Sequence, residues 1–329
     1  MKRTSYAAAA AALSILTAVA LLLNGCHSHS GLPDPSSAQY AELVSDFYVG
    51  LSALQVGDDV TAQRSLSQTV EVAPGEPAGW ANWGILALRQ RNFDPAAERL
   101  NRARELAPKN SKMYYLLGLL GSARGDSQMA IDNYRKAVSL DPKDLRASYA
   151  LALEIERQGA AGSEEEFQKL IEQILTVQPD NLAALLELSR ISAKRGDTAT
   201  LHSTIQRIAA QSATWPQDVK QQLAELESAA SGPEPRAAAT RSIFLRNVLM
   251  QVPAFRVSLS DIKPAPGDEA QPFTHFLRLP SPSSTPAPPD AGIAFTPQPV
   301  AGLGGDHWTW VGAVSLNGEG APTVIAANA

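Results

Sequence analysis

The chain has 329 residues, of which 44% are hydrophobic, 19% charged and only 6% aromatic, and its formal net charge is −5. This slightly acidic balance argues against nucleic-acid binding, because that function draws most of its affinity from basic side chains that neutralise phosphates. A single cysteine, Cys26, excludes an intramolecular disulfide framework and a zinc site built from several cysteines. The length suits about two domains.

The first 25 residues have the pattern of a targeting segment. Lys2 and Arg3 precede an uncharged apolar run at residues 7–23, and the small residue Gly25 follows. The run is slightly short for a membrane span, and a small residue after it is typical of a signal-peptide cleavage site. We therefore expect residues 1–25 to be a signal peptide.

The tetrapeptide Leu23-Asn24-Gly25-Cys26 resembles the lipobox of bacterial lipoproteins, although Asn24 is an uncommon residue in its slot. The resemblance implies cleavage before Cys26 and acylation of its thiol and new amine, and several acyl chains anchor a protein stably. The alternative is an ordinary signal peptide or a transmembrane anchor with an incidental cysteine. By resemblance to enterobacterial sorting rules, the absence of an aspartate after Cys26 favours the outer membrane, with the protein facing the periplasm.

Residues 26–37 have the composition of a linker and would tether the folded part to the bilayer. His27 and His29 beside Cys26 form a possible metal-binding cluster. If the thiol is acylated, however, its softest ligand is lost, so we expect no metal here.

The middle of the chain repeats every 34 residues. Three kinds of position keep this period: glycines, alanines and prolines, at Gly50, Gly84, Gly118, Ala62, Ala96, Ala130, Pro74, Pro108 and Pro142. Large residues such as Trp80 fill core positions between them. The glycines indicate close helix approach, the alanines are expected to be the small partners on the second helix, and the prolines end each second helix.

This period and these residue types resemble the tetratricopeptide repeat, a helical hairpin that stacks into a solenoid. The clearest units are 43–76, 77–110 and 111–144; a fourth, 145–181, is closed by Pro179, and a fifth covers 182–212. A helix near residues 216–230 has a polar face that suits a cap. The expected fold is mainly α: a solenoid of about five repeats plus a capping helix over 38–230, with a small, partly irregular β-containing region after it.

The resemblance implies a concave surface, lined by the first helix of each hairpin, that binds a peptide or a protein. The repeat register places mostly apolar and aromatic residues on that surface, which excludes the basic carboxylate clamp of a well-known variant. The predicted groove residues are Phe47, Leu51, Ile85, Tyr115, Leu119, Tyr149, Leu153 and Arg190, and Arg89, Arg157 and Lys194 could form a basic rim. Tyr115 and Tyr149 are the strongest single candidates for ligand contact.

Two other interpretations of the solenoid stay open. The groove could be filled by the chain's own residues 237–279, which would make the solenoid a structural base. The chain could also be a non-catalytic subunit of an enzyme or export complex in the envelope.

After residue 231 the composition changes. Residues 237–250 have the pattern of an amphipathic helix, whereas 254–262 and 273–279 alternate like short strands, so 231–279 is expected to hold a helix and short strands. Residues 280–306 are rich in proline and form a linker.

The last segment, residues 307–329, resembles part of an FG-GAP/VCBS-type propeller blade, and the order of parts resembles bacterial proteins that join such propellers to tetratricopeptide repeats. That family binds calcium through aspartates, but here the slots hold Ser315, Asn317, Glu319, Gly320 and Thr323. Because Ca²⁺ prefers six or more oxygen ligands with charge among them, we expect a structural turn and no strong calcium site. The segment is too short to close a propeller.

No catalytic arrangement is visible in the sequence. His202, His275 and His307 are dispersed, and the glycines at 302–305 lack the helix and lysine of a phosphate-binding loop. We therefore expect no enzyme activity, no cofactor and no resident metal. The function predicted from the sequence is a lipid-anchored envelope scaffold that binds protein segments.

Overall fold

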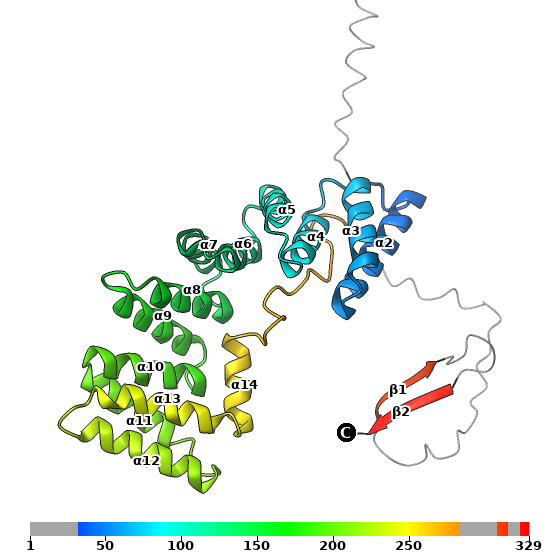
Figure 1. The fold of residues 1–329 in the computed structure, drawn as a ribbon. Coiled ribbons are helices and arrows are strands. Elements are labelled where there is room, and N and C mark those ends of the chain that lie inside the picture. The colour runs from blue at the N-terminus through cyan, green and yellow to red at the C-terminus, as the bar shows by residue number, and fades with distance from the viewer. Residues whose placement is uncertain (1–31, 283–307, 315–322, 329) are drawn as a thin grey trace, which may run out of the picture. The chain divides into compact units, whose positions relative to one another are not determined.

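The computed structural model describes residues 32–282, 308–314 and 323–328. Residues 32–282 are built almost entirely from helices (Figure 1). This confirms the prediction of a mainly helical solenoid. None of the helices described there is both long and apolar enough to cross a membrane.

Five helical hairpins follow one another along the chain. Within each hairpin the two helices pack together, and each second helix also packs on the first helix of the next hairpin. The pairs are α2 (Ala38–Val56) with α3 (Asp59–Val72), α4 (Pro77–Arg89) with α5 (Phe93–Leu106), α6 (Ser111–Arg124) with α7 (Ser127–Leu140), α8 (Leu145–Gln158) with α9 (Ser163–Val177), and α10 (Leu182–Arg195) with α11 (Thr198–Ala209).

Side-chain caps explain where the first helix of each hairpin begins. An oxygen of Ser37, Glu76, Asn110, Asp144 or Asn181 accepts a hydrogen bond from a backbone N–H in the first turn. Such acceptors satisfy donors that the helix itself cannot pair. The repeat prolines Pro74, Pro108, Pro142 and Pro179 lie in the short loops before these caps. Two aromatic residues 34 positions apart fix the loops: Trp80 donates to the Pro74 carbonyl at 3.0 Å and Tyr114 to the Pro108 carbonyl at 3.1 Å.

The turn inside the second hairpin departs from the repeat. Gly57 and Gly125 occupy this turn in the first and third hairpins with φ of 80° and 77°, but Arg91 occupies it here with φ of 59°. For residues other than glycine, this left-handed conformation costs roughly 1–2 kcal/mol. The guanidinium of Arg91 lies over the ring of Phe93, 5.6 Å from its centroid.

The repeat glycines lie against large residues of the second helix of the hairpin. A Cβ added to Gly84 would lie 2.7 Å from Leu100, and one added to Gly118 would lie 2.4 Å from the ring of Tyr134. Each of these partners lies one turn after the repeat alanine. Ala130 contacts another glycine of α6, Gly121, whose added Cβ would lie 2.6 Å from the Ala130 nitrogen. Ala62, Ala96 and Ala130 are each fully buried.

Three helices follow the fifth hairpin: α12 (Gln217–Ser231), α13 (Ala237–Leu249) and α14 (Pro253–Ile262). Helix α12 packs against α11 and α13, so two helices close this end of the solenoid where the sequence suggested one. Helix α13 lies against α10, and α14 contacts both α10 and α8. Figure 1 shows α13 and α14 beside α10.

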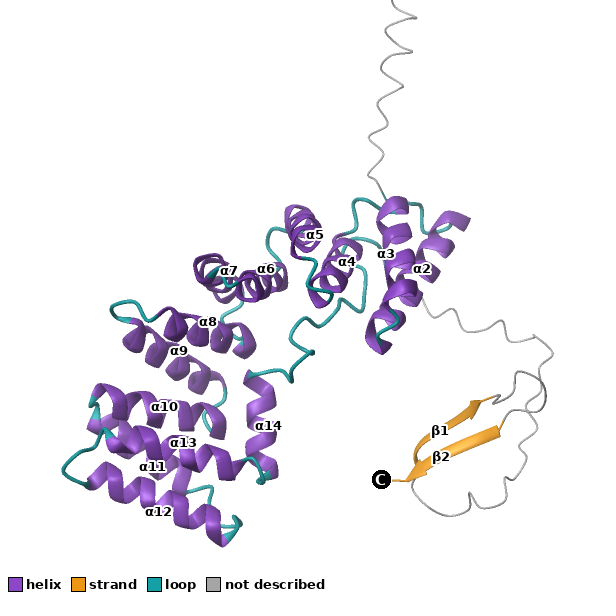
Figure 2. Cartoon of the chain, viewed as in Figure 1, coloured by secondary structure: helices purple, strands orange, loops and turns teal. Residues whose placement is uncertain are grey.

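The two strands predicted at 254–262 and 273–279 are wrong. The first segment is helix α14, where Pro253 starts the helix and the buried residues Phe255, Ser258 and Ile262 have helical spacing. The second segment has no strand and is drawn as loop in Figure 2. Its buried residues, Phe273, Phe276 and Leu279, recur every third position, whereas a strand buries every second one.

After residue 282 the structure describes only β1 (Trp308–Val314) and β2 (Thr323–Asn328), which belong to a unit separate from the helical part. These strands pair antiparallel, with Val311 opposite Ala326 and Gly312 opposite Ile325. Four of the five predicted calcium-slot positions, at 315–320, lie outside the described residues. So do residues 1–31, which include the signal segment and Cys26, and most of the predicted linker at 280–306.

Candidate functional site

All eight predicted groove residues lie on the first helices of the hairpins, α2 to α10. Five of them are buried, and Leu119, Leu153 and Arg190 are partly buried; the buried ones are Phe47, Leu51, Ile85, Tyr115 and Tyr149. Later parts of the same chain cover this inner face. Helices α13 and α14 cover its C-terminal half, and the segment after α14 covers its N-terminal half.

Polar contacts hold α13 and α14 on the inner face. The hydroxyls of Ser189 on α10 and Ser242 on α13 lie 3.0 Å apart. The side-chain amide of Asn181 donates to the Ser258 carbonyl at 2.9 Å, and the Ser258 hydroxyl accepts from the Ala183 N–H at 3.2 Å. Asn181 therefore caps α10 and also fixes α14.

Tyr149 and Arg190 belong to a charged network beneath α13. The carboxylate of Glu187 accepts hydrogen bonds from the Tyr149 hydroxyl at 3.3 Å and from Arg190 at 2.7 Å. Arg190 also forms two hydrogen bonds with Glu156, and Arg246 of α13 reaches Glu187 at 3.3 Å. Burial raises the pKa of the Tyr149 hydroxyl. The structure therefore places these two predicted ligand residues in contacts within the chain.

The three residues of the predicted basic rim also form ion pairs within the chain. Arg89 bridges Asp59, Arg157 bridges Glu154 and Lys194 bridges Glu164. Each of these charges therefore contacts a neighbouring carboxylate in the solenoid.

An irregular segment, residues 271–280, lies on the N-terminal half of the inner face and bends at 277–279; we call it the strap. Figure 1 shows this part of the chain returning past α4 towards α2. Its Phe276 ring enters an aromatic pocket, 4.5 Å from the ring centroid of Phe47 and 6.4 Å from that of Tyr40. Phe273 and Leu279 are buried in the same apolar cluster. These three side chains anchor the strap.

The solenoid holds the strap's main chain through two buried side chains. Asn82 of α4 accepts from the Phe273 N–H at 2.7 Å and donates to the Phe273 carbonyl at 2.9 Å. The carboxylate of Glu76 accepts from the N–H groups of Leu277, Arg278 and Leu279 at 2.8, 2.9 and 3.0 Å. These contacts bind the main chain of the segment and leave most of its side chains free to vary.

The ends of the strap have further polar contacts. Lys112 donates to the Pro272 carbonyl at 3.0 Å, and its ammonium lies 4.3 Å from the centroid of the Phe273 ring. At the other end, the Tyr40 hydroxyl donates to the Pro280 carbonyl. Burial lowers the pKa of Lys112 to about 8.

The shifted Lys112 predicts a pH dependence. Between about pH 8 and its ordinary pKa of 10.5, the folded chain binds fewer protons at Lys112 than the unfolded chain, so stability rises with pH in this window. We expect the wild type to gain stability relative to Lys112→Met between pH 8 and pH 10, measured as the urea midpoint by circular dichroism. A difference between the two proteins that stays constant over this range would contradict the prediction.

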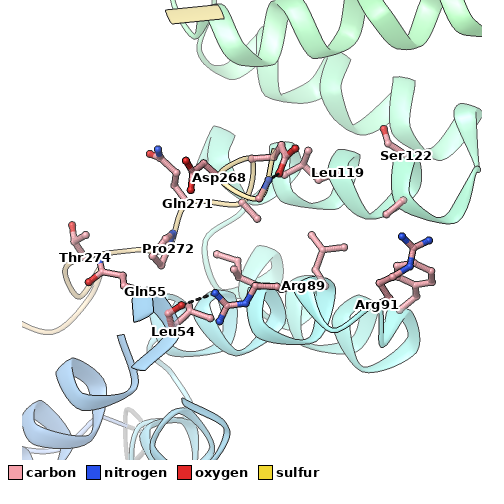
Figure 3. A pocket seen from close by; sticks show the side chains of 17 residues that line it. Leu54, Gln55, Arg89, Arg91, Leu119, Ser122, Asp268, Gln271, Pro272 and Thr274 are labelled. Atoms are coloured by element: carbon pink, nitrogen blue, oxygen red, sulfur yellow. Dashed lines mark hydrogen bonds between the residues drawn. The ribbon is translucent and has the colours of Figure 1, made fainter. Parts of the chain in front are cut away.

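A cavity of about 880 Å³ remains between the inner face and the residues just before and at the start of the strap. Its apolar wall comes from α4 and α6 and includes Ile85, Leu88 and Leu119. Asp268, Gln271 and Pro272 line the opposite side (Figure 3). The strap therefore fills the groove around Phe276 but only bridges it near Leu119.

The sequence prediction missed the side chains that hold the strap: Asn82, Glu76 and Lys112. Asn82 is a fully buried polar residue within an apolar helix, which was a usable signal. Glu76 lies 34 residues before the helix cap Asn110, so its capping role was readable from the repeat. In the part of the chain that the structure describes, no group of three or more His, Cys, Asp or Glu side chains is placed to hold a metal ion.

The tetratricopeptide-repeat family model matches residues 81–144. This match covers most of α4 and continues through α7, and it confirms the predicted repeats there; the other hairpins have the same arrangement. The helical region is thus a solenoid that resembles the tetratricopeptide-repeat fold, with the family match itself confined to residues 81–144. The comparison with curated proteins gives no match.

Several solved structures have a similar arrangement of helices. Pseudomonas aeruginosa PilF is 15% identical, with 68% of this chain and 100% of that chain covered and a TM-score of 0.48. MamA from Desulfovibrio magneticus RS-1 is 15% identical, with 54% and 98% covered and a TM-score of 0.45. YrrB, described as a tetratricopeptide-repeat protein with an unusual peptide-binding site, is 14% identical, with 50% and 84% covered and a TM-score of 0.41.

Proposed function

We propose that this protein is an interaction scaffold whose inner groove, formed by α2, α4 and α6, binds irregular protein segments through their main chain. The observation that carries the proposal is the hydrogen bonding of Asn82 and Glu76 to the main-chain N–H groups of Phe273, Leu277, Arg278 and Leu279. Contacts of this kind depend little on the side chains of the bound segment, while apolar pockets select particular side chains. Tetratricopeptide repeats in general bind protein partners, which supports the same role.

A second candidate function is favoured by the covered inner face. Because α13, α14 and the strap all pack on it, the solenoid could serve as a structural base for its own C-terminal region, within an envelope complex and without activity of its own. The two functions predict the same cis contacts. They differ in whether a partner ever contacts the groove.

We further propose that the scaffold is anchored by lipid at Cys26, in the envelope and facing the periplasm. The support is the Leu23-Asn24-Gly25-Cys26 tetrapeptide after an apolar run, together with the linker composition of residues 26–37. The anchor would raise the local concentration of the groove at the membrane, which strengthens the capture of partners that share it. The resemblance of residues 307–329 to part of a propeller blade stays a prediction.

Photo-crosslinking in the native membrane tests this function. A photoreactive phenylalanine analogue replaces Leu119 in the groove; the control places it at Val60, which is 82% exposed on the outer helix α3. We expect a discrete protein adduct from position 119 that is absent from position 60 and is lost in Cys26→Ser, as that variant leaves the membrane. If both positions give the same adducts, the contact is non-specific and the groove function is contradicted. If the membrane fraction of Cys26→Ser is unchanged, the proposal of a lipid anchor at Cys26 is contradicted.

A further inference from the structure

We propose that the strap is an internal ligand that competes with a partner segment of the same chemistry. The partner segment would have phenylalanine at its first and fourth positions and an aliphatic residue at its seventh. This inference rests on the proposed function, because it requires the groove to bind segments in trans. It adds the class of partner and the reason why the groove is covered in the free chain.

The contacts of the strap define this chemistry position by position. Phe273 needs a backbone N–H for Asn82, so the first position is not proline. Phe276 fills the aromatic pocket beside Phe47, and a second aromatic ring is the side chain that fits there. The N–H groups at the fifth to seventh positions donate to Glu76, which excludes proline from all three.

Most of the remaining strap side chains do not select a partner. Thr274, His275 and Leu277 are exposed, and Leu277 retains 41% of its accessible surface although it is apolar. Arg278 is exposed too, but its guanidinium donates to the Leu106 carbonyl at 2.5 Å. A foreign segment could carry other residues at these positions and still form the same buried contacts. The specificity therefore lies in the Phe-x-x-Phe-x-x-aliphatic spacing and in the exclusion of proline.

The segment that joins the strap to α14 leaves a cavity beneath it. The residues of this segment, 263–270, form local contacts with one another: the Asp268 N–H donates to the Ala265 carbonyl, and the Gly267 N–H donates to Glu269. Beneath them lies the 880 Å³ cavity instead of packed side chains. A partner segment with apolar residues before its first phenylalanine could fill this cavity against Leu88 and Leu119. It would gain contacts that the strap itself does not form.

Competition makes a quantitative prediction, because a ligand that needs the open groove binds with its intrinsic affinity reduced by the fraction of open molecules. The probe is a fluorescent peptide with the sequence of residues 270–282, measured by anisotropy against the full chain. The strap of that chain is released by Phe273→Ala with Phe276→Ala. We expect this variant to bind the peptide at least tenfold more tightly than the wild type. The matched control, His275→Ala with Leu277→Ala, should bind like the wild type.

The outcomes separate the two proposals. Equal, measurable binding by wild type and release variant would overturn the competition and leave the groove function standing. No binding by either would overturn both. A wild type that sediments as a dimer, and whose dimer is broken by the release substitutions, would show that a second copy's strap is the occupant and would also overturn the partner assignment.

A second measurement covers the case in which the release variant loses helix content. Excess unlabelled peptide is added to the wild type, and amide hydrogen exchange is followed in the fragment that contains Leu277 to Leu279. Displacement predicts faster exchange of these amides, which Glu76 protects in the free chain. Unchanged exchange at saturating peptide would contradict competition without relying on any substitution.

Discussion

Gly118→Ala is expected to lower the free energy of unfolding by about 3 kcal/mol, which is the upper part of the range for overpacking a core. The added Cβ would lie 2.4 Å from two ring atoms of Tyr134. That ring is 2% exposed and packs against Tyr115, 5.7 Å between centroids, while its hydroxyl lies 3.3 Å from that of Ser122. The ring is held on several sides, so α6 and α7 must separate to admit the methyl group.

The control for this effect is Gly50→Ala, the same substitution two repeats earlier. There the added Cβ would lie 2.9 Å from the Cγ of the buried Leu66, a less severe contact than the 2.4 Å at Gly118. Alanine also favours the helix by about 1 kcal/mol over glycine at both positions, so the close contact is the difference between them. Urea unfolding followed by circular dichroism measures both variants. An equal loss of stability in the two would mean that the Tyr134 contact is not the cause.

The 34-residue period made most of the solenoid predictable. Close contacts recur at equivalent positions of each hairpin, so both Gly84 and Gly118 lie where an added Cβ would clash with the second helix. The caps are equally local, since Asn110 and Asp144 bond N–H groups within three residues. Signals that act within one hairpin and then repeat can be read without knowing the neighbours.

What covers the groove could not be predicted in detail. Asn82 and Phe273 are 191 residues apart, and no local pattern indicates that an asparagine amide will pair with that main chain. The apolar residues of the strap at 273, 277 and 279 fit an alternating strand, and only the burial of Phe276 with exposure of Leu277 reveals the period of three. The sequence left self-occupation of the groove open as one alternative, without identifying its contacts.

The misassigned helix α14 shows the same ambiguity in a short segment. Residues 254–262 alternate apolar and polar over much of their length, yet Phe255, Ser258 and Ile262 also lie on one helical face. In a segment of this length the two periods are hard to separate. The packing of α14 on α8 and α10 decides the outcome, and that partner surface is distant in the sequence.

Glu76→Ala is expected to release the strap while the solenoid stays folded. The carboxylate is fully buried and accepts three strap N–H groups and the Ala78 N–H of its own helix. Hydrogen bonds to charged groups contribute about 1.5–3 kcal/mol each. Because the freed strap N–H groups regain water, we expect a net loss of about 2–4 kcal/mol in strap docking, seen as roughly 30- to 1,000-fold faster amide exchange at Leu277 to Leu279.

The loss of a helix cap alone is not expected to speed amide exchange in the strap. The variant Asp144→Ala, which also removes a cap, is the control for this. Asp144 caps α8 by accepting from the N–H groups of Arg146 and Ala147, and its side chain has no hydrogen bond to the strap. Each substitution removes a cap worth about 1 kcal/mol, but only Glu76→Ala removes the acceptor for the strap main chain. Fast strap exchange in both variants would show that docking depends on general stability, whereas fast exchange confined to Glu76→Ala identifies this carboxylate as the group that holds the groove closed.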